Sequence, residues 1–433
     1  MKVLPVFPLF PPSFWSYKYA VELVNKKATM PPTGLITVCA MLPKEHFDVL
    51  PVVDLNVSPL TDRQIRESDI VFVSSMIVQR DSLKEIIDRT HFFGKKVVAG
   101  GPYPTSYTNE VSVDHLVLGE AEVTLKPFIE DLINGKARHI YDSKSVLKEG
   151  YNLPLTKGGK PLLTNTPLPR WDLLDLNKYS SLAIQYSRGC PFNCDFCDIT
   201  NLFGRESRTK TPEQMVREVE SIYKTGWRGS IFIVDDNFIG NKEEVRKMLP
   251  RLTKWQKEHS YPYTFFTEAS MDLAIHNNQD IRRGMIDAGF DSIFVGIESD
   301  DPDVIRGMRK GQNLGAITPA NKIKILQESG FEVTGGFIIG SDKEKLDVFN
   351  RLFNFIQESG IVIPMVGLLT ALRGTDLYKR LELEGRLVSD TTGNNTHSLG
   401  FNFKTKLDEN FLINGYVGNT FICSHIISSS LQG

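Results

Sequence analysis

Short apolar runs alternate with longer amphipathic stretches along about the first 135 residues of the chain. The stretches at 81–93 and 122–133 repeat their apolar positions every three to four residues, which predicts helices, whereas the short runs predict buried strands. Strands that alternate with helices form a parallel sheet covered on both faces. The chain therefore begins with an α/β domain. Its predicted strands are 2–7, 47–53, 69–74, 96–99 and 115–118.

A second alternating series begins at Ser181. Its helices are bounded by start signals such as Thr211-Pro212 and by stop signals such as Gly289. About six strand–helix units in roughly 200 residues predict a partial (β/α)6 barrel of the TIM type rather than the full eight units. The predicted strands are 182–186, 229–234, 263–267, 292–296, 332–338 and 362–370, and the predicted helices are 212–225, 242–258, 279–288, 316–329 and 343–359.

The domain organisation follows from these two series. A chain of 433 residues is too long for one ordinary core, so two domains are expected. Residues 1–140 are assigned to a Rossmann-like α/β domain and residues 181–380 to the partial barrel. Residues 141–180, rich in Pro, Gly, Lys and Asn, are predicted to be a linker with little regular structure. Residues 381–433 are predicted to be a C-terminal extension.

The composition is typical of a soluble globular protein, with 41% apolar and 24% charged residues. A formal net charge of −2 gives no indication of nucleic acid or an anionic membrane surface as a partner. The apolar start of the chain is broken by proline, so a buried strand is expected there rather than a signal peptide. No run of about 18 apolar residues is present, so no transmembrane helix is expected.

Two glycine-containing turns follow predicted strands of the first domain, Gly100-Gly101-Pro102 and Gly119-Glu120. Loops at the carboxyl ends of parallel strands normally bind ligands, so these turns are candidates for a ligand site. The chain contains no G-x-G-x-x-G, and a nicotinamide cofactor therefore has little support.

Three of the five cysteines, Cys190, Cys194 and Cys197, lie within eight residues, directly after the first barrel strand. This clustering indicates a metal site in a reducing compartment, such as the cytoplasm, rather than a secreted disulfide framework. A [4Fe–4S] cluster normally takes four thiolates, so three would leave one iron open. The alternatives are a zinc site or three core cysteines together by chance. Zinc would require a fourth nearby ligand, and the closest downstream histidine is His259.

The pattern C-x3-C-x2-C, with an aromatic residue before the last cysteine, resembles the hallmark of the radical S-adenosylmethionine (SAM) superfamily. The resemblance implies that the three cysteines ligate a [4Fe–4S] cluster whose open iron binds the amino and carboxylate groups of SAM. One-electron cleavage of SAM then yields a 5′-deoxyadenosyl radical, which abstracts hydrogen from the substrate. Polar residues at the ends of barrel strands are the implied SAM contacts, namely Asp236, Glu268 and Glu298.

These secondary motifs are each ambiguous when taken alone. An Asp-Asp-Asn sequence such as Asp235-Asp236-Asn237 is also typical of a solvated turn or a helix cap. Gly335-Gly336 before an apolar run is also typical of close packing. Their positions support a site, because each follows a predicted strand on the face that carries chemistry in β/α barrels.

An α/β domain ahead of the barrel resembles the cobalamin-binding class of this superfamily. In that class the corrin lies over the carboxyl ends of the N-terminal sheet. The signature D-x-H-x-x-G, which supplies a histidine to cobalt in other cobalamin proteins, is absent here. The alternative is therefore a Rossmann-like domain that has lost cobalamin or only packs on the barrel. The implied corrin-lining residues are Ser74, Gly100, Gly101, Gly119 and Glu120.

Within this class, the chain is most similar to the hopanoid methylase subfamily and its lipid-modifying relatives, over residues 1 to about 416. The resemblance implies methylation of an unactivated carbon, with methylcobalamin as methyl donor and a second SAM recharging the cobalt. One alternative keeps both cofactors and forms a ring or a carbon–carbon bond. Another is a non-catalytic electron-transfer protein, which the open iron disfavours. The segments that carry the resemblance are 30–35, 190–199, 210–214, 234–241 and 384–388.

The resemblance also implies partners. The substrate is a small molecule or a lipid, and an external flavodoxin- or ferredoxin-like protein supplies the electron. The expected location is the cytoplasm, with peripheral association to a membrane as an alternative. The segment from Val417 to Gly433 departs from the family, because it is short, apolar and rich in serine. A truncated or altered terminus is the hypothesis for this segment.

Overall fold

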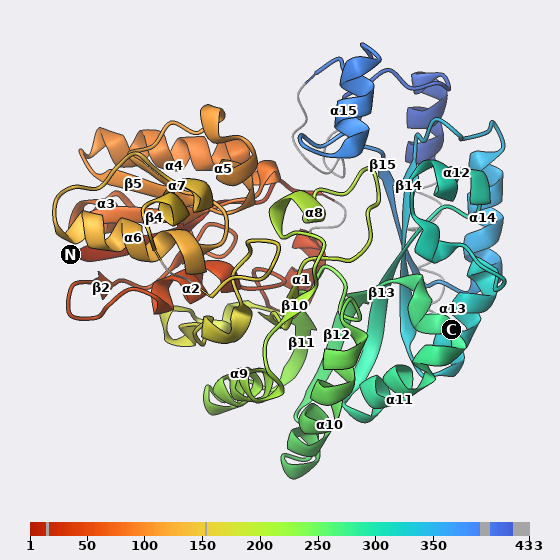
Figure 1. The fold of residues 1–433 in the computed structure, drawn as a ribbon, viewed down its shortest axis with the longest axis horizontal. Helices are drawn as coiled ribbons and strands as arrows, with labels where there is room; N and C mark the ends of the chain where they lie inside the picture. Colours follow the sequence, from red (N-terminus) through yellow and green to blue (C-terminus); the bar gives the residue numbers. More distant parts are fainter. Residues whose placement is uncertain (14–16, 152–153, 390–398, 419–433) are drawn as a thin grey trace. The chain divides into compact units, whose positions relative to one another are not determined.

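The computed structural model describes residues 1–13, 17–151, 154–389 and 399–418 (Figure 1). The chain divides into two compact units. The first comprises residues 1–184 and 217–228, and the second comprises residues 185–216 and 229–433. Both units are built on parallel sheets with helices, so the predicted α/β class is confirmed.

The first unit contains a seven-stranded parallel sheet with the order β2-β1-β4-β5-β6-β7, and β3 also pairs with β1. The strands are β1 (Lys2–Phe7), β2 (Asp48–Val49), β3 (Val53–Asp54), β4 (Ile70–Ser74), β5 (Lys96–Gly100), β6 (His115–Val117) and β7 (Ile140–Tyr141). The helices are α1 (Lys18–Leu23), α2 (Thr33–Ala40), α3 (Asp62–Glu67), α4 (Arg80–Phe92), α5 (Pro102–Ser106), α6 (Ala121–Ile133) and α7 (Ser143–Lys148).

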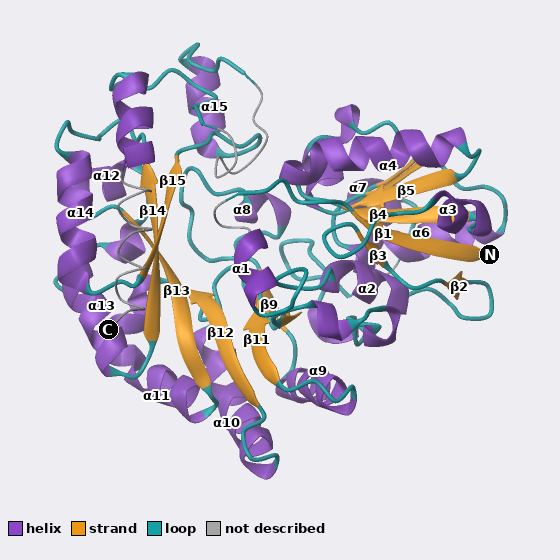
Figure 2. Ribbon diagram, turned by 180° about the vertical axis from the view of Figure 1, so that it is seen from behind, coloured by secondary structure: helices purple, strands orange, loops and turns teal. Residues whose placement is uncertain are grey.

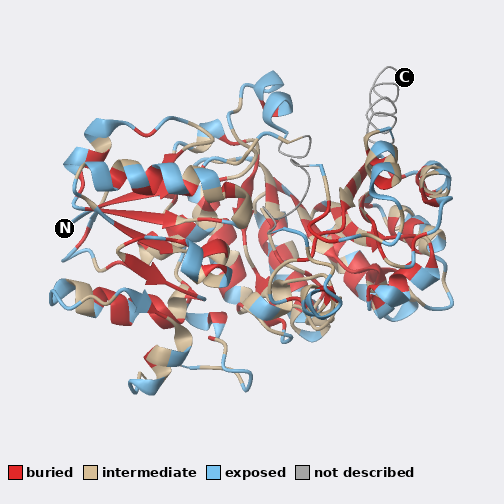
Figure 3. Ribbon diagram, turned by 90° about the horizontal axis from the view of Figure 1, so that it is seen from above, coloured by how far each residue is buried: buried red, intermediate tan, exposed pale blue. Residues whose placement is uncertain are grey.

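Both faces of this sheet are covered, as the apolar strands predicted. Alternate residues of β4 belong to different cores: Val71 and Val73 pack in one, and Ile70 and Phe72 pack in the other. The first core is completed from α3 and α4, and the second from α6 and α7. Figure 3 shows the resulting buried strands between helices whose outer faces are exposed. A strand buried on both faces must be apolar throughout, which explains its continuous apolar run.

Two expectations for the first unit need correction. The predicted strand 47–53 is two short strands, β2 and β3, because Pro51 lies between them and cannot donate to a ladder. The segment 141–180, expected to have little regular structure, holds α7 and several short 3-10 turns. Trp171 and Tyr179 from this segment are buried, so apolar contacts order it within the first unit.

The second parallel sheet has the order β15-β14-β13-β12-β11-β8, which corresponds to the six predicted barrel strands. Figure 2 shows α10, α11, α13 and α14 along one face of the curved sheet. The strands are β8 (Leu182–Ile184), β11 (Gly229–Ile233), β12 (Tyr263–Ala269), β13 (Phe290–Glu298), β14 (Glu332–Ile339) and β15 (Ile363–Leu368). The helices are α9 (Pro212–Lys224), α10 (Lys242–Glu258), α11 (Gln279–Asp287), α12 (Pro302–Gly307), α13 (Pro319–Glu328), α14 (Val348–Ser359) and α15 (Asp376–Leu383).

Two glycines in β14 have a packing role. A Cβ atom added to Gly335 would lie 2.9 Å from Cδ1 of Ile297, and one added to Gly336 would lie 2.6 Å from Cζ of Phe294. These contacts come from side chains of β13. The close-packing interpretation of Gly335-Gly336 therefore holds, since a side chain at either position would collide with these neighbouring side chains.

The chain after α15 pairs back on itself through a bridge between Leu387 and Phe403, and residues 409–418 are helical. The proposed departure of the terminus falls mostly on 419–433, outside the described residues. Across the parts of the chain that the structure describes, no helix is long and apolar enough to cross a membrane.

Candidate active site

The three clustered cysteines lie in a loop, here called the cysteine loop (residues 189–198), between β9 (Ser187–Arg188) and α8 (Ile199–Leu202). β9 pairs with β10 (Arg208–Thr209) in a small antiparallel sheet. The loop starts at Gly189, whose φ of 90° is rarely adopted by residues with a side chain. A Cβ atom there would lie only 2.5 Å from the carbonyl oxygen of Glu206. Glycine is thus needed for both the turn and the close approach.

Replacing Gly189 with alanine is expected to reduce the free energy of unfolding by about 3 kcal/mol, because backbone strain and a steric clash add together. Gly385 is the matched control, since its φ is 64° and a Cβ atom added to it would meet no other described residue within 4 Å. Gly385→Ala should cost only about 1 kcal/mol, from strain alone. Urea unfolding measures both, and equal costs would show that the contact with Glu206 is unimportant.

Two adjacent carboxylates at the end of β11 anchor the entry to the cysteine loop. Asp235 is buried and accepts hydrogen bonds from the backbone N–H groups of Tyr186 and Ser187, at 2.8 and 2.9 Å, and from the Ser187 hydroxyl at 2.7 Å. Asp236 accepts a hydrogen bond of 3.0 Å from the N–H of Gly189. Asp236, predicted as a SAM contact, therefore holds the loop. The sequence interpretation missed Asp235 as a site residue.

The three thiols are partly buried. Burial raises the pKa of each of them, and that of Cys197 to about 12. Cys194 and Cys197 line a polar cavity of about 200 Å³ together with Arg205. Among the residues that the structure describes, no three His, Cys, Asp or Glu side chains converge on a single metal ion. Thiolates that bind different irons of a cubane do not need to converge on one point.

Amide side chains lie against two of the thiols. The Nδ2 atom of Asn237 lies 3.9 Å from Sγ of Cys190, and the Nε2 atom of Gln312 lies 3.4 Å from Sγ of Cys194. Asn237 is held in turn by Ser270, which donates to its Oδ1 atom. N–H donors directed at cluster sulfurs stabilise their negative charge. Gln312 was not predicted, because it is 118 residues from Cys194 in the chain.

Glu298 forms a buried ion pair with Lys310. Its φ of 63° is unusual for a residue other than glycine, and it lies where the pairing of β13 with β14 shifts register. A Cβ atom on Gly296 would lie 2.5 Å from both Oε1 of Glu298 and Nζ of Lys310. The glycine therefore leaves room for the pair. Such backbone strain persists only where the surroundings enforce it, often at functional sites.

Lys310 is a site residue that the sequence interpretation missed. Burial lowers its pKa, but the negative charges of Glu298 and Cys194 outweigh this effect, so the pKa is raised. The lysine thus stays charged beside the cysteine loop, where it lowers the pKa of Cys194 against the effect of burial. A buried cation at this position suits an anionic group, either a cluster thiolate or a carboxylate.

Carboxyl groups with raised pKa values gather at the ends of β11 and β12. Burial raises the pKa of Glu268 to about 7, helped by the negative charge of Asp236, and it raises the pKa of Asp236 itself to about 6. Titratable groups shifted in this way cluster at functional sites. The structure thus places the predicted residues Asp236 and Glu268 near each other, and Asp236 contacts the start of the cysteine loop.

The predicted corrin-lining residues lie along one edge of the first unit's sheet, the edge formed by the carboxyl ends of its parallel strands. Ser74 of β4 pairs with Gly100 of β5, and Gly100 pairs with Val117 of β6, so the carboxyl ends of three strands are adjacent. Gly119 and Glu120 follow two and three residues after Val117. The register therefore brings the five predicted residues to the same edge.

Gly100 and Gly101 lie too close to neighbouring atoms to carry a side chain. A Cβ atom on Gly101 would lie 2.7 Å from Oγ of Ser74, and one on Gly100 would lie 2.9 Å from the carbonyl oxygen of Val117. The next residue after Ser74, Ser75, is buried, and its hydroxyl has no hydrogen-bond partner within the described residues. Buried polar groups are normally paired, so a bound ligand is one explanation for this hydroxyl.

Comparison with family models identifies the class of protein. Residues 184–356 match the model of the radical SAM superfamily, and residues 375–420 match a domain of unknown function, DUF4070. The first match contains the cysteine loop, Asp236, Glu268, Glu298 and Lys310. The class defined by this fold and site is that of the radical SAM enzymes, as the cysteine spacing predicted.

Sequence comparison identifies the family within this class. The chain is 42% identical to the uncharacterized methyltransferase sll1242 of Synechocystis sp., over 93% of this chain and 72% of the relative. It is 34% identical to the hopanoid C-2 methylase of Rhodopseudomonas palustris, over 90% of this chain and 71% of the relative. The chain belongs to the radical SAM methyltransferase family that includes these two proteins, so the predicted hopanoid methylase resemblance is confirmed.

Solved structures share the fold. The radical SAM methyltransferase TsrM from Kitasatospora setae, solved with cobalamin and a [4Fe–4S] cluster, matches with a TM-score of 0.66 at 16% identity, over 88% of this chain and 75% of TsrM. The cobalamin-dependent radical SAM enzyme OxsB, solved with aqua-cobalamin, matches with a TM-score of 0.70 at 16% identity, over 97% of this chain and 66% of OxsB. The predicted two-part architecture is therefore a known one.

Proposed function

We propose that the protein is a cobalamin-dependent radical SAM enzyme that methylates an unactivated carbon. The observation that carries the proposal is the cysteine loop, whose three thiols are partly buried and whose entry is anchored by two strand-end carboxylates. Membership of a methyltransferase family supports the type of reaction. The names of TsrM and OxsB support the combination of cobalamin with SAM chemistry in this architecture.

The residues of the second unit fit a [4Fe–4S] cluster and SAM. Cys190, Cys194 and Cys197 would hold the cluster, which when bound to SAM supplies the electron that cleaves it. Asn237 and Gln312 would donate N–H groups to the sulfurs of Cys190 and Cys194. These contacts stabilise thiolates in a partly buried site and fix the side chains of the loop.

Charged groups around the loop would orient SAM. Lys310, kept protonated by Glu298, is suited to a carboxylate. Glu268 and Asp236 are suited to amino or hydroxyl groups, as the resemblance implied. Their raised pKa values mean that they exchange protons more readily near neutral pH than ordinary carboxyl groups do. The roles of Asp236, Glu268 and Glu298 as direct SAM contacts remain predictions.

The first unit fits a cobalamin site at the edge that carries Ser74, Gly100, Gly101, Gly119 and Glu120. Bound cobalamin supplies the methyl group that is transferred to the substrate carbon. The unpaired Ser75 hydroxyl would donate to a polar group of the cofactor. The same unit supplies the parallel sheet on which three strand ends meet, a common location for ligands in α/β folds.

Replacing Ser75 with alanine should stabilise the chain by about 1 kcal/mol, because a buried hydroxyl without a partner is removed. The same change should weaken cobalamin binding about fivefold, the effect of one lost hydrogen bond. Ser68, which precedes β4 by two residues, is the control, since it is buried and donates to the carbonyl of Ile65. Ser68→Ala should lose stability and keep cobalamin. Unchanged cobalamin binding in Ser75→Ala, measured by absorbance after desalting, would reject the contact.

We infer that the substrate is a lipid, supported by the 34% identity to a hopanoid C-2 methylase. A lipid substrate would bring the protein to a membrane surface from the cytoplasm. A flavodoxin- or ferredoxin-like protein is the proposed electron donor, since the cluster needs one electron for each SAM cleaved. Mass spectrometry of lipids from a deletion strain tests the substrate class, and an unchanged lipid profile would reject it.

Anaerobic incubation of the reconstituted protein with SAM, a reductant and hydroxocobalamin tests the reaction. 5′-Deoxyadenosine together with S-adenosylhomocysteine is the expected result. Deoxyadenosine without S-adenosylhomocysteine would reject methyl transfer and favour a ring- or carbon–carbon-bond-forming enzyme. No deoxyadenosine would reject radical SAM catalysis and leave a non-catalytic electron carrier.

A further inference from the structure

Helix α15 contacts the cysteine loop directly. We call the described residues 375–389 and 399–418 the C-terminal module, since they fall within the DUF4070 match. The backbone N–H of Leu377, in α15, donates a hydrogen bond of 2.8 Å to the carbonyl oxygen of Asp195, which lies between Cys194 and Cys197. Thr375 and Asp376 line the same polar cavity as these two cysteines. The start of α15 and the loop thus share one site.

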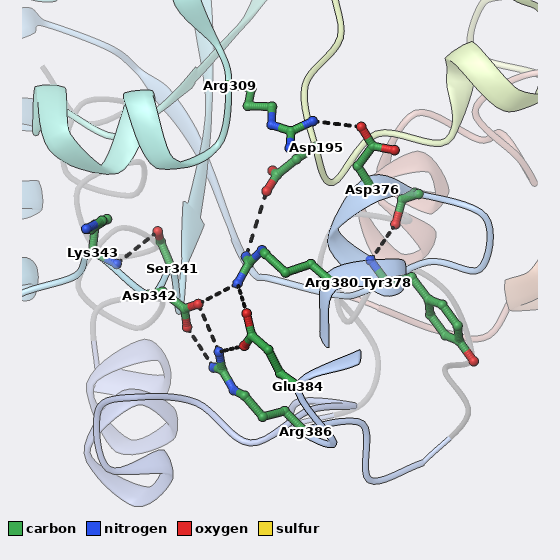
Figure 4. A network of polar contacts seen from close by, with 11 residues as sticks. Asp195, Arg309, Ser341, Asp342, Lys343, Asp376, Tyr378, Arg380, Glu384 and Arg386 are labelled. Carbon is green, nitrogen blue, oxygen red and sulfur yellow. Dashed lines mark hydrogen bonds and ion pairs between the residues drawn. The ribbon is translucent and has the colours of Figure 1, made fainter. Parts of the chain in front are cut away.

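The Asp195 side chain provides a second contact. It is buried, and its Oδ2 atom lies 3.9 Å from Nη2 of Arg380 in α15. Burial raises the pKa of Asp195 to about 6, while Arg380 and Arg309 act to lower it. Arg309 also pairs with Asp376 at 2.8 Å, which ties α15 to the segment after α12 (Figure 4). The loop is therefore held through its backbone and through a buried charge.

Arg380 is itself fixed by Asp342, which follows β14. Asp342 accepts a hydrogen bond of 2.8 Å from Nη1 of Arg380. It also accepts hydrogen bonds from Arg386 on both of its carboxylate oxygens, at 2.6 and 2.9 Å (Figure 4). Burial would raise the pKa of Asp342, but hydrogen bonds from Arg386 and Arg380 lower it to about 2. Arg386 also donates to the carbonyl oxygen of Lys404. Bidentate Arg–carboxylate pairs fix geometry as well as charge.

We propose that the C-terminal module positions the cysteine loop: Asp342 anchors Arg380 and Arg386, and α15 holds Asp195 and thereby Cys194 and Cys197. This inference rests on the proposed function for its consequence in catalysis, but the contacts themselves do not depend on it. The role assigned to Asp342, Arg380 and Asp195 is positioning, because none of them is a ligand.

Thiol labelling of the chain before cluster reconstitution tests the contacts. Iodoacetamide should modify Cys194 and Cys197 about tenfold faster in Asp342→Asn and in Arg380→Ala than in the protein without substitutions, because local opening of the loop then costs less free energy. Arg380→Lys should restore part of the protection, since it keeps the charge beside Asp195. Labelling is measured for each cysteine by mass spectrometry.

Asp280→Asn is the matched control. Asp280 also accepts two hydrogen bonds from one arginine, Arg246, in the second unit, but neither residue contacts the cysteine loop. This variant should leave the labelling rates unchanged. Labelling of Asp342→Asn and Arg380→Ala at the wild-type rate would overturn the proposal. Faster labelling in all three variants, the control Asp280→Asn included, would also overturn it, because it would indicate general loosening of the chain.

A second readout uses the reconstituted protein. Asp342→Asn and Arg380→Ala should lose iron to a chelator about tenfold faster than Asp280→Asn and should show an altered EPR signal of the reduced cluster. Unchanged iron loss and EPR spectra would reject positioning of the cluster. If the unmodified protein assembles no cluster, the proposed function fails, whereas the labelling result still decides whether α15 holds the loop.

Discussion

An alanine at position 197 is expected to abolish cluster assembly and to reduce SAM cleavage at least about a thousandfold, because a cubane held by two thiolates is not retained. Cys197 is the most strongly shifted of the three thiols, with a pKa raised to about 12 by burial. Iron binding must therefore displace its proton, and the alanine removes the ligand altogether. Absorbance, iron content and deoxyadenosine formation measure the effect.

Cys39 supplies the control for this experiment. It is buried in α2 of the first unit and is not part of the cysteine loop. Cys39→Ala should bind iron and cleave SAM like the unmodified protein, at a stability cost of about 1 kcal/mol from the small cavity. Cluster assembly by Cys197→Ala with full SAM cleavage would contradict the assignment of the loop as the cluster site.

Replacing Lys310 with methionine is expected to reduce the free energy of unfolding by about 3–5 kcal/mol, because the buried carboxylate of Glu298 loses its partner. The same variant should also lose SAM cleavage, since the cation beside Cys194 is removed. Urea unfolding and deoxyadenosine formation separate the two effects. Methionine has about the volume of lysine, so packing around Gly296 is retained.

The double variant Glu298→Gln with Lys310→Met distinguishes structure from function. A neutral pair carries no buried charge, so most of the lost stability should return, whereas SAM cleavage should not. Recovery of both would show that the ion pair acts only in folding. Recovery of neither would show that Glu298 has a role in stability beyond its charge.

Much of the fold could be predicted from periodicity. The six barrel strands and the helix 242–258 were located correctly, because apolar runs mark the strands and a helical period marks the helix. The strand at 47–53 was wrong because Pro51 overrides an apolar run. Residues 141–180 looked like a linker, since their buried residues, such as Trp171 and Tyr179, are scattered among Pro and Gly without a period.

The candidate site was predictable only in part. The spacing of the cysteines identified the class of enzyme, and the position of Asp236 and Glu268 after strands indicated polar groups near them. Gln312 and Lys310 could not be found in this way, because they lie more than 100 residues from the cysteines and outside any strand end. The fold alone brings Gln312 to the thiol of Cys194 and Lys310 to the carboxylate of Glu298.

By itself, the sequence determined the chemistry that is local: three thiols within eight residues, a glycine that allows the turn at 189, and apolar runs that must be buried. The tertiary structure decided everything that depends on long-range contact. It brought the carboxylate of Asp236 into a hydrogen bond with the backbone N–H of Gly189, paired Glu298 with Lys310, and placed α15 against Asp195. The spacing of the cysteines is encoded over a few residues. The groups that set the electrostatics around them and hold their loop come together only when strands and helices pack.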